Sequence, residues 1–192
     1  MKVASITYVL IALLMLAGSA LGVADDSTLI ADKQNAIIFI RHALAPGTGD
    51  PAVFDISDCS TQRNLSQQGR QQAHDIGKKL RDLGVTDVPV YTSEWCRCRE
   101  TADLMADVMN AGPVEDLALL NSFFATPADG PQQLQKLRRW LSTASTPLVL
   151  VTHQVVITGM TDVYPASGEM VVTTLDTDGA LKVVSTVATE IR

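Results

Sequence analysis

The stretch Ala-Ile-Ile-Phe-Ile-Arg-His-Ala at residues 36–43 decides the fold class of this chain. Its first five residues form an unbroken apolar run, which indicates a strand buried on both faces, as the strands of a parallel sheet are. Residues 147–152, Pro-Leu-Val-Leu-Val-Thr, form a second run of this kind. Since helical patterns lie between the two runs, the sequence predicts an α/β fold.

Strands and helices alternate along the rest of the chain. Ser66 is the expected N-cap of a helix that runs to Leu83, with Gly84 as its C-cap. Other helices are expected at about 99–110, 131–141 and 155–160, and other strands at 88–91, 114–120, 170–175 and 181–187. Asp178-Gly179 predicts a hairpin turn between the last two strands. We therefore expect a three-layer α/β/α sandwich whose mostly parallel central sheet has an antiparallel C-terminal edge.

The first 24 residues predict a secretory signal peptide. Met1 and Lys2 precede an apolar run at residues 9–17, and small residues follow it. The candidate cleavage points are before Leu21 and before Asp25. An uncleaved membrane anchor is the alternative, but the apolar run is short of the ~20 residues that a span needs. Residues 25–192 would then form a single periplasmic or secreted domain, with no stable membrane insertion after cleavage.

The charge balance limits the classes of partner. Fifteen Lys and Arg against 21 Asp and Glu give a net charge of −6. This acidity argues against a general binder of nucleic acid or of anionic membranes. Any anion that the protein handles must be bound by a few local cations.

Histidines follow both buried runs. Arg41-His42 end the first run and His153 ends the second. Because open α/β sheets bind ligands at the carboxyl ends of their strands, we expect the two histidines to share a site. His74 lies within a predicted helix, off its apolar stripe, and is not expected there. Residues 93–102 turn from a strand into a helix, whose first N–H groups favour an anion.

Four motifs, in order, resemble those of the histidine phosphatase superfamily, which has the phosphoglycerate mutase-like fold. They are the Arg-His-Ala of residues 41–43, the Arg-x-Leu-Ser-x-x-Gly-x-x-Gln-Ala of 63–73, the Ser-x-x-x-Arg-x-x-x-Thr-Ala of 93–102 and the Thr-His-Gln of 152–154. Several motifs at suitable intervals are far more specific than one. The resemblance runs from about residue 36 to 183 and, with the leader, indicates a small exported member of the family.

The resemblance implies a role for each matched residue. His42 is the nucleophile that accepts the phosphoryl group, and Arg41, Arg97 and His153 hold that group, with the backbone N–H of Gln154 as a further donor. Phosphoryl transfer needs mainly positioning and neutralised charge, for which planar guanidinium groups are suited. Two neighbouring cations should also keep the attacking imidazole neutral.

The chain departs from the family pattern at three places. Ala43 replaces a glycine, Gln154 replaces a glycine or aspartate, and Asn121 stands where many relatives carry an acid that protonates the leaving group. Glu169 is the first candidate for that acid, Asp129 is the second, and a site without any donor is the third possibility. A site without a donor would favour phosphohistidine or an acyl phosphate as substrate.

Arg63 and the three cysteines complete the expected site. Arg63 points into the pocket or pairs with a nearby acid. Cys59 is expected to form a disulfide with Cys96 or Cys98, with Cys98 as the favoured partner; three free thiols are the alternative. No metal site and no cofactor are expected, since Arg41 and Arg97 would repel a cation and no motif has ligand spacing.

These expectations combine into one functional hypothesis. The chain would be an exported, metal-independent phosphatase that hydrolyses a phosphomonoester through a phosphohistidine on His42. Its partner would be a small phosphorylated substrate or a phosphorylated envelope component, and no nucleic acid. The alternatives are a phosphohistidine phosphatase, or a non-catalytic phosphate- or phosphoglycan-binding protein of the same fold. The sequence leaves the substrate and the oligomeric state open.

Overall fold

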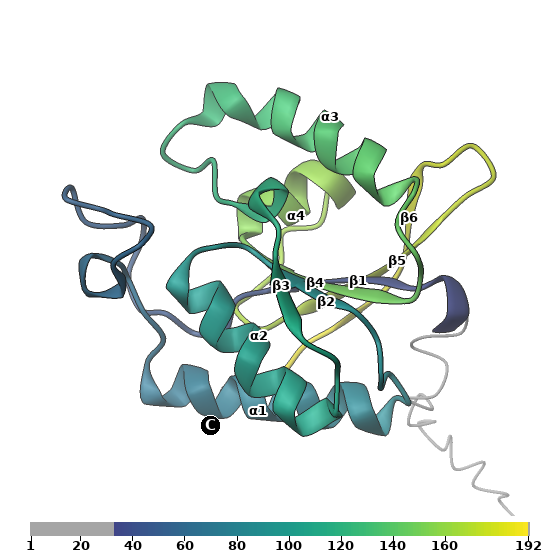
Figure 1. Cartoon of the computed structure of the whole chain (residues 1–192), viewed down its shortest axis with the longest axis horizontal. Coiled ribbons are helices and arrows are strands. Elements are labelled where there is room, and N and C mark those ends of the chain that lie inside the picture. Colours follow the sequence, from purple (N-terminus) through teal and green to yellow (C-terminus); the bar gives the residue numbers. More distant parts are fainter. Residues whose placement is uncertain (1–32, 192) are drawn as a thin grey trace, which may run out of the picture.

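The structure is a computed structural model that describes residues 33–191. Six strands form one sheet in the order β3-β2-β4-β1-β5-β6 (Figure 1). The strands are β1 (Ile37–Arg41), β2 (Val90–Thr92), β3 (Val114–Asp116), β4 (Leu148–Thr152), β5 (Met170–Leu175) and β6 (Leu181–Val187). The helices are α1 (Gln67–Asp82), α2 (Cys96–Met109), α3 (Gly130–Leu141) and α4 (Gln154–Thr161). The expected signal peptide and its cleavage points lie outside the described residues.

The directions of the strands agree with the sequence pattern. β1 pairs in parallel with β4, which pairs in parallel with β2, and β2 with β3. β5 and β6 are antiparallel and form the C-terminal edge. The register aligns Arg41 with Thr152, so β1 and β4 end at the same level. The residues that follow these two strands are therefore neighbours.

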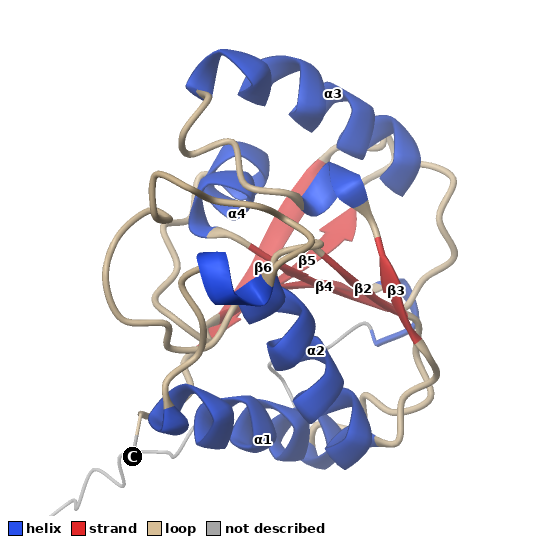
Figure 2. Ribbon diagram, turned by 60° about the vertical axis from the view of Figure 1, so that its left-hand side comes forward, coloured by secondary structure: helices blue, strands red, loops and turns tan. Residues whose placement is uncertain are grey.

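Helices cover both faces of the sheet, which confirms the three-layer sandwich. Figures 1 and 2 show α1 and α2 on one face and α3 and α4 on the other. Because side chains alternate along a strand, β1 serves both cores. Ile38 and Ile40 pack with α1 and α2, and Ile37 and Phe39 pack with α3 and α4. Within residues 33–191, no helix is both long and apolar enough to cross a bilayer.

Two element boundaries differ from the expected ones. α2 begins at Cys96 and not near residue 99, because the Trp95 carbonyl accepts hydrogen bonds from the backbone N–H groups of Cys98 and Arg99. A tryptophan at this position gives no cap signal in a sequence. The third strand ends at Asp116, and the chain continues as a 3₁₀ turn at Ala118–Leu120. The other expected elements lie within a few residues of their predicted positions.

The start of α1 fixes the loop that follows β1. The Ser66 hydroxyl accepts a hydrogen bond of 3.0 Å from the Gly69 N–H, as expected of an N-cap. A Cβ at Gly69 would lie 2.1 Å from the Leu44 carbonyl oxygen. Only glycine therefore allows the helix to lie against the backbone two residues beyond His42. This contact gives a physical reason for the glycine in the second motif.

Replacing Gly69 with alanine should lower the free energy of unfolding by about 2 kcal/mol. The backbone clash lowers the free energy of unfolding by about 3 kcal/mol, and the better helix propensity of alanine raises it by about 1 kcal/mol. Urea unfolding measures the change. Gly112→Ala is the matched control, because a Cβ there meets nothing within 4 Å. Equal stability of the two variants would contradict the prediction.

Candidate active site

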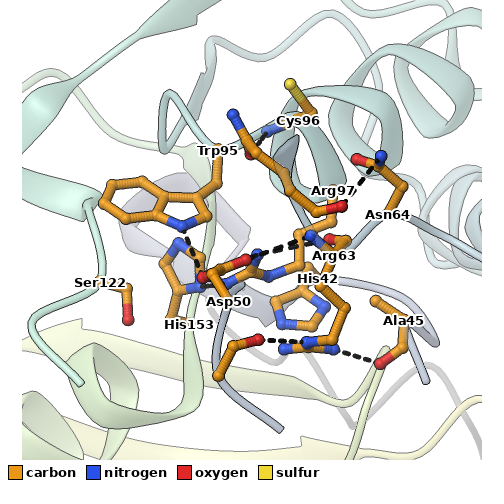
Figure 3. Close-up of polar contacts among 12 residues, drawn as sticks. His42, Ala45, Asp50, Arg63, Asn64, Trp95, Cys96, Arg97, Ser122 and His153 are labelled. Carbon is orange, nitrogen blue, oxygen red and sulfur yellow. Dashed lines mark hydrogen bonds and ion pairs between the residues drawn. The ribbon is translucent and has the colours of Figure 1, made fainter. Parts of the chain in front are cut away.

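The carboxyl ends of β1 and β4 place two buried histidines side by side. His42 and His153 are 3% and 4% exposed, and their ring centroids are 5.5 Å apart (Figure 3). Both line a cavity of about 780 Å³ that we call the site cavity. Its lining also includes Arg41, Asp50, Arg63, Trp95, Arg97 and Gln154. The structure thus brings together the residues that four separate motifs contribute.

One ring nitrogen of His42 is held by the backbone, and the other keeps its lone pair. Its Nδ1 lies 2.8 Å from the Ala43 carbonyl oxygen. A carbonyl only accepts hydrogen bonds, so Nδ1 carries the proton and Nε2 keeps its lone pair. Burial, with the positive charges of Arg97, Arg41 and Arg63, lowers the pKa of His42 to about 3. The imidazole is therefore neutral and able to attack over the whole physiological pH range.

His153 is held by groups on both sides of its ring. Its Nδ1 lies 3.4 Å from Arg97 Nη2, which only donates, so Nδ1 accepts and Nε2 carries the proton. Nε2 lies 2.9 Å from the Ser93 hydroxyl, which in turn donates to Asn121 Oδ1 at 3.1 Å. Burial, together with the positive charges of Arg97, Arg63 and Arg41, lowers the pKa of His153 well below 6.5. Donation from Nδ1 to a phosphoryl oxygen would require that Nδ1 gain a proton.

Three arginines surround the histidines. Arg97 contacts Asp50, Arg41 donates to the Pro165 carbonyl at 2.9 Å, and Arg63 donates to the Gly49 carbonyl at 2.8 Å. Arg63 therefore lines the cavity and also braces the loop that follows β1. Within the described residues, the Nε atoms of Arg41 and Arg97 are buried and have no hydrogen-bond partner. Buried donors without partners are rare in proteins.

Neither expected proton donor lies in the site cavity. The Glu169 carboxylate accepts a 2.7 Å hydrogen bond from the Ala166 N–H and closes a turn. Asp129 is exposed and precedes α3. Neither residue is part of the cavity lining. Asn121 is not part of the cavity lining either. Its side-chain amide forms hydrogen bonds with Ser93 and Glu94 instead, and through Ser93 it positions His153 indirectly.

Gln154 lies at the expected place but turns its side chain elsewhere. It is the first residue of α4, directly after His153. Its side-chain amide donates to the Thr158 hydroxyl at 2.8 Å. A contribution of Gln154 to anion binding would therefore come from its backbone N–H, as expected.

The expected disulfide of Cys59 forms, but the prediction that Cys98 is its favoured partner is wrong. Cys59 is bonded to Cys96, and Cys98 is free and buried. Residues two apart on a helix point about 200° away from each other, so only one of the two cysteines can face the loop. Cys98 packs in the core between α2 and the sheet, and burial raises the pKa of its thiol to about 12. The disulfide fastens the loop after β1 to the first residue of α2, beside Arg97.

Sequence reasoning missed Asp50 and Trp95. Both Asp50 oxygens contact the Arg97 guanidinium, and the Trp95 indole N–H donates to Asp50 at 3.0 Å. The Trp95 ring stacks on Phe54, with centroids 5.0 Å apart. The only available signal was that the Gly- and Pro-rich loop is long, which is typical of functional loops.

Removal of the disulfide should lower stability strongly. The bridge joins residues 37 positions apart. In the chain-entropy model, a bridge across a loop of this length restricts the unfolded chain, and its loss lowers the free energy of unfolding by about 4 kcal/mol. We expect Cys59→Ser to lower the urea midpoint accordingly. A reductant should lower the midpoint of the wild type to the same value and leave the variant unchanged. A wild type that is insensitive to reductant under unfolding conditions would contradict this.

The buried histidines should make the protein less stable in mild acid. In the unfolded chain both take up a proton near pH 6.5, whereas in the folded chain both stay neutral. Lowering the pH from 7 to 5 therefore favours the unfolded chain by about 2 kcal/mol for each histidine. Urea unfolding at both pH values measures this loss, and His42→Gln should remove about half of it. An unchanged loss in His42→Gln would show that His42 is already protonated in the folded protein.

Comparison with known proteins agrees with this geometry. A model of the histidine phosphatase superfamily (branch 1) matches residues 37–141. The serine/threonine-protein phosphatase Pgam5 of Drosophila grimshawi is 34% identical over 76 residues, which cover 40% of this chain and 24% of that protein. The probable phosphoglycerate mutase GpmB of Erwinia tasmaniensis is 40% identical over 52 residues, covering 27% and 23%. The matched stretches span about a quarter of these curated relatives.

Two solved structures illustrate the likeness of the fold. The protein histidine phosphatase SixA, complexed with tungstate, superposes with a TM-score of 0.61 at 17% identity and covers 80% of this chain and 96% of its own. A phosphoglycerate mutase from Plasmodium falciparum superposes with a TM-score of 0.52 at 20% identity, covering 78% and 88%. At these identities the two structures are similar to this chain in fold alone.

Proposed function

Because this chain belongs to the histidine phosphatase superfamily, we propose that it is a metal-independent phosphatase that hydrolyses phosphomonoesters through a phosphohistidine on His42. One observation carries the proposal. His42, a neutral imidazole whose Nε2 keeps its lone pair, lines a cavity that three arginines, Arg41, Arg63 and Arg97, also line. Such a site suits a transferring phosphoryl group better than a neutral ligand.

The reaction follows from these contacts in two steps. Arg41 and Arg97 hold the phosphoryl oxygens while His42 Nε2 attacks phosphorus and the ester oxygen leaves. A water molecule then attacks the phosphohistidine, and the electron pair of the broken bond returns to Nε2. The guanidinium groups supply the positive charge that neutralises the phosphoryl oxygens in both steps. Arg63 adds charge and keeps the loop in place.

The mouth of the cavity suits the leaving group of a small phosphorylated substrate or a phosphorylated envelope component. Phe124 and Tyr164 line the cavity and are 53% and 74% exposed, and Phe54 lies beside Trp95. Aromatic faces bind sugar rings, aromatic rings and apolar groups without requiring a charge. We therefore expect the phosphoryl group to provide most of the binding energy and the aromatic rim to select among leaving groups.

We place the protein in the periplasm or outside the cell. The apolar leader of the sequence and the Cys59–Cys96 disulfide both support this, since disulfides persist in oxidising compartments. Fractionation of cells that produce the full chain tests it. A full-length chain in the cytoplasm with reduced Cys59 would contradict it.

The test of the function is phosphate release with EDTA present, measured on a panel of phosphomonoesters. We expect turnover that survives chelation, and an acid-labile, alkali-stable phosphoryl label on the denatured protein, as a phosphohistidine gives. Turnover that EDTA stops would contradict metal independence. Binding of vanadate without turnover of any ester would instead favour the non-catalytic phosphate-binding protein.

A further inference from the structure

An aspartate occupies the anion site formed by Arg97. The Asp50 carboxylate accepts from Arg97 Nη1 at 2.7 Å and Nη2 at 3.1 Å, in the forked geometry that guanidinium groups also use for phosphates (Figure 3). It accepts two further hydrogen bonds, from the Trp95 indole at 3.0 Å and the Arg63 backbone N–H at 3.3 Å. The Arg97 fork cannot hold this carboxylate and a phosphoryl group at once.

Asp50 is also the one carboxylate among the described residues that line the site cavity. Its side chain is 16% exposed and reaches the cavity from the loop after β1. Glu169 and Asp129 lie outside this lining. An acid that protonates a leaving group must be within reach of the scissile bond. Asp50 is therefore the candidate that the geometry offers.

We propose that Asp50 is the proton donor to the leaving group, and that the phosphoryl group of the substrate frees it by displacing it from Arg97. This rests on the proposed function, because it assigns a residue to the first step of that reaction. Asp50 would touch the leaving oxygen and would then be a catalytic residue. In the resting state, without substrate, the Asp50 carboxylate is paired with Arg97.

The electrostatics of the pair support the exchange. Burial raises the pKa of the Asp50 carboxyl, but the hydrogen bonds and charge of Arg97, with the contacts from Trp95 and Arg63, outweigh burial and bring the pKa below its usual value. A phosphoryl group on Arg97 removes the largest of these opposing effects and adds a negative charge nearby. Both changes favour the protonated carboxyl. Arrival of the substrate thus prepares the acid that the reaction needs.

The loop allows the side chain to move while its frame stays fixed. Arg63 binds the carbonyl oxygens of Ala45 and Gly49, on either side of the turn at Gly47. The disulfide at Cys59 fastens the far end of the loop to α2. These ties hold the backbone near the cavity when Asp50 leaves Arg97. A rotation of one side chain is then enough to change its partner.

The step balances in atoms and charge. The lone pair of His42 Nε2 forms the bond to phosphorus, and the bond from phosphorus to the ester oxygen breaks with its electron pair on that oxygen. The Asp50 carboxyl gives this oxygen its proton, which yields a neutral alcohol and a carboxylate. In the second step the carboxylate takes a proton from the attacking water. Release of phosphate and of that proton returns Asp50 to Arg97.

The test compares leaving groups. We would measure kcat/KM of the wild type, Asp50→Asn and Asp55→Asn on 4-nitrophenyl phosphate, phenyl phosphate and glycerol 2-phosphate. Asp55 is the matched control, since it lies in the same loop, contacts Ser57 and is not part of the cavity lining. For Asp50→Asn we expect a loss of about 100-fold on glycerol 2-phosphate and less than about 5-fold on 4-nitrophenyl phosphate, whose leaving group needs no proton.

A second measurement does not depend on turnover. Binding of inorganic phosphate at pH 7, followed by calorimetry in buffers of different ionisation enthalpy, should show proton uptake by the wild type. Asp50→Asn should show clearly less uptake. Equal uptake in both proteins would overturn the proposal.

The other outcomes are equally distinct. An equal loss on all three esters in Asp50→Asn would mean that Asp50 only positions Arg97. A gain on all three would mean that it only competes with substrate, and either result overturns the proposal. Absence of His42-dependent turnover of 4-nitrophenyl phosphate by the wild type would overturn the proposed function itself, and the role of Asp50 with it.

Discussion

Replacement of His42 with alanine should reduce phosphate release from 4-nitrophenyl phosphate by at least ~10⁴-fold, because among residues 33–191 no other group that lines the cavity combines a free lone pair with this position. The variant should also fail to acquire an acid-labile phosphoryl label. Both effects follow from loss of the covalent intermediate, so they should appear together. The arginines remain, and vanadate should still bind.

His74→Ala is the matched control for this variant. His74 lies on α1, outside the cavity lining, and its removal should change kcat by less than about 2-fold. Thermal unfolding of both variants excludes a general loss of structure. Residual labelling of His42→Ala, or a rate within 10-fold of the wild type, would show that the nucleophile lies elsewhere.

Replacement of Arg97 with lysine should lower kcat/KM by about 10³-fold. Lysine keeps the charge but loses the planar fork, so the phosphoryl oxygens lose two directed hydrogen bonds. Arg97 also donates to His153 Nδ1 and to Asp50, so its loss disturbs three components of the site. Steady-state kinetics and the affinity for inorganic phosphate measure the effect, and both should weaken.

Arg99→Lys is the control for the Arg97 variant. Arg99 lies two positions further along α2, contacts Asp103 and Asp116 and donates to the Val114 carbonyl, away from the site cavity. It should retain kcat/KM within about 2-fold. A similar loss in both variants would point to a defect of α2 as a whole and would contradict a specific role for Arg97 in phosphate binding.

Much of the fold could be predicted because buried strands leave a strong local signal. The apolar runs before His42 and His153 predicted two central strands, and parallel topology then placed both histidines at one edge. Ser66 gave a cap signal that the structure confirms. Such features depend on residues close in sequence.

The missed features depend on contacts between distant residues. Cys96 and Cys98 lie at nearly the same distance from Cys59 in the sequence, and only the start of α2 at Cys96 decides which one faces it. Asp50 lies 47 positions before Arg97, in a loop without periodicity. The Ser167-Gly168 pair signals the turn before Glu169, but the hydrogen bond that the Glu169 carboxylate accepts from the Ala166 N–H leaves no signal in the sequence.

The order of the strands has a consequence for how the chain acquires its structure during synthesis. β1 is made early, but it lies between β4 and β5, which come from the last third of the chain. Its backbone therefore has no strand to pair with until residues 148–152 have been made, although α1, α2 and α3 precede them. Folds dominated by such distant pairings form slowly. If the protein is translocated across a membrane, as we propose, late folding keeps the chain extended and ready for export.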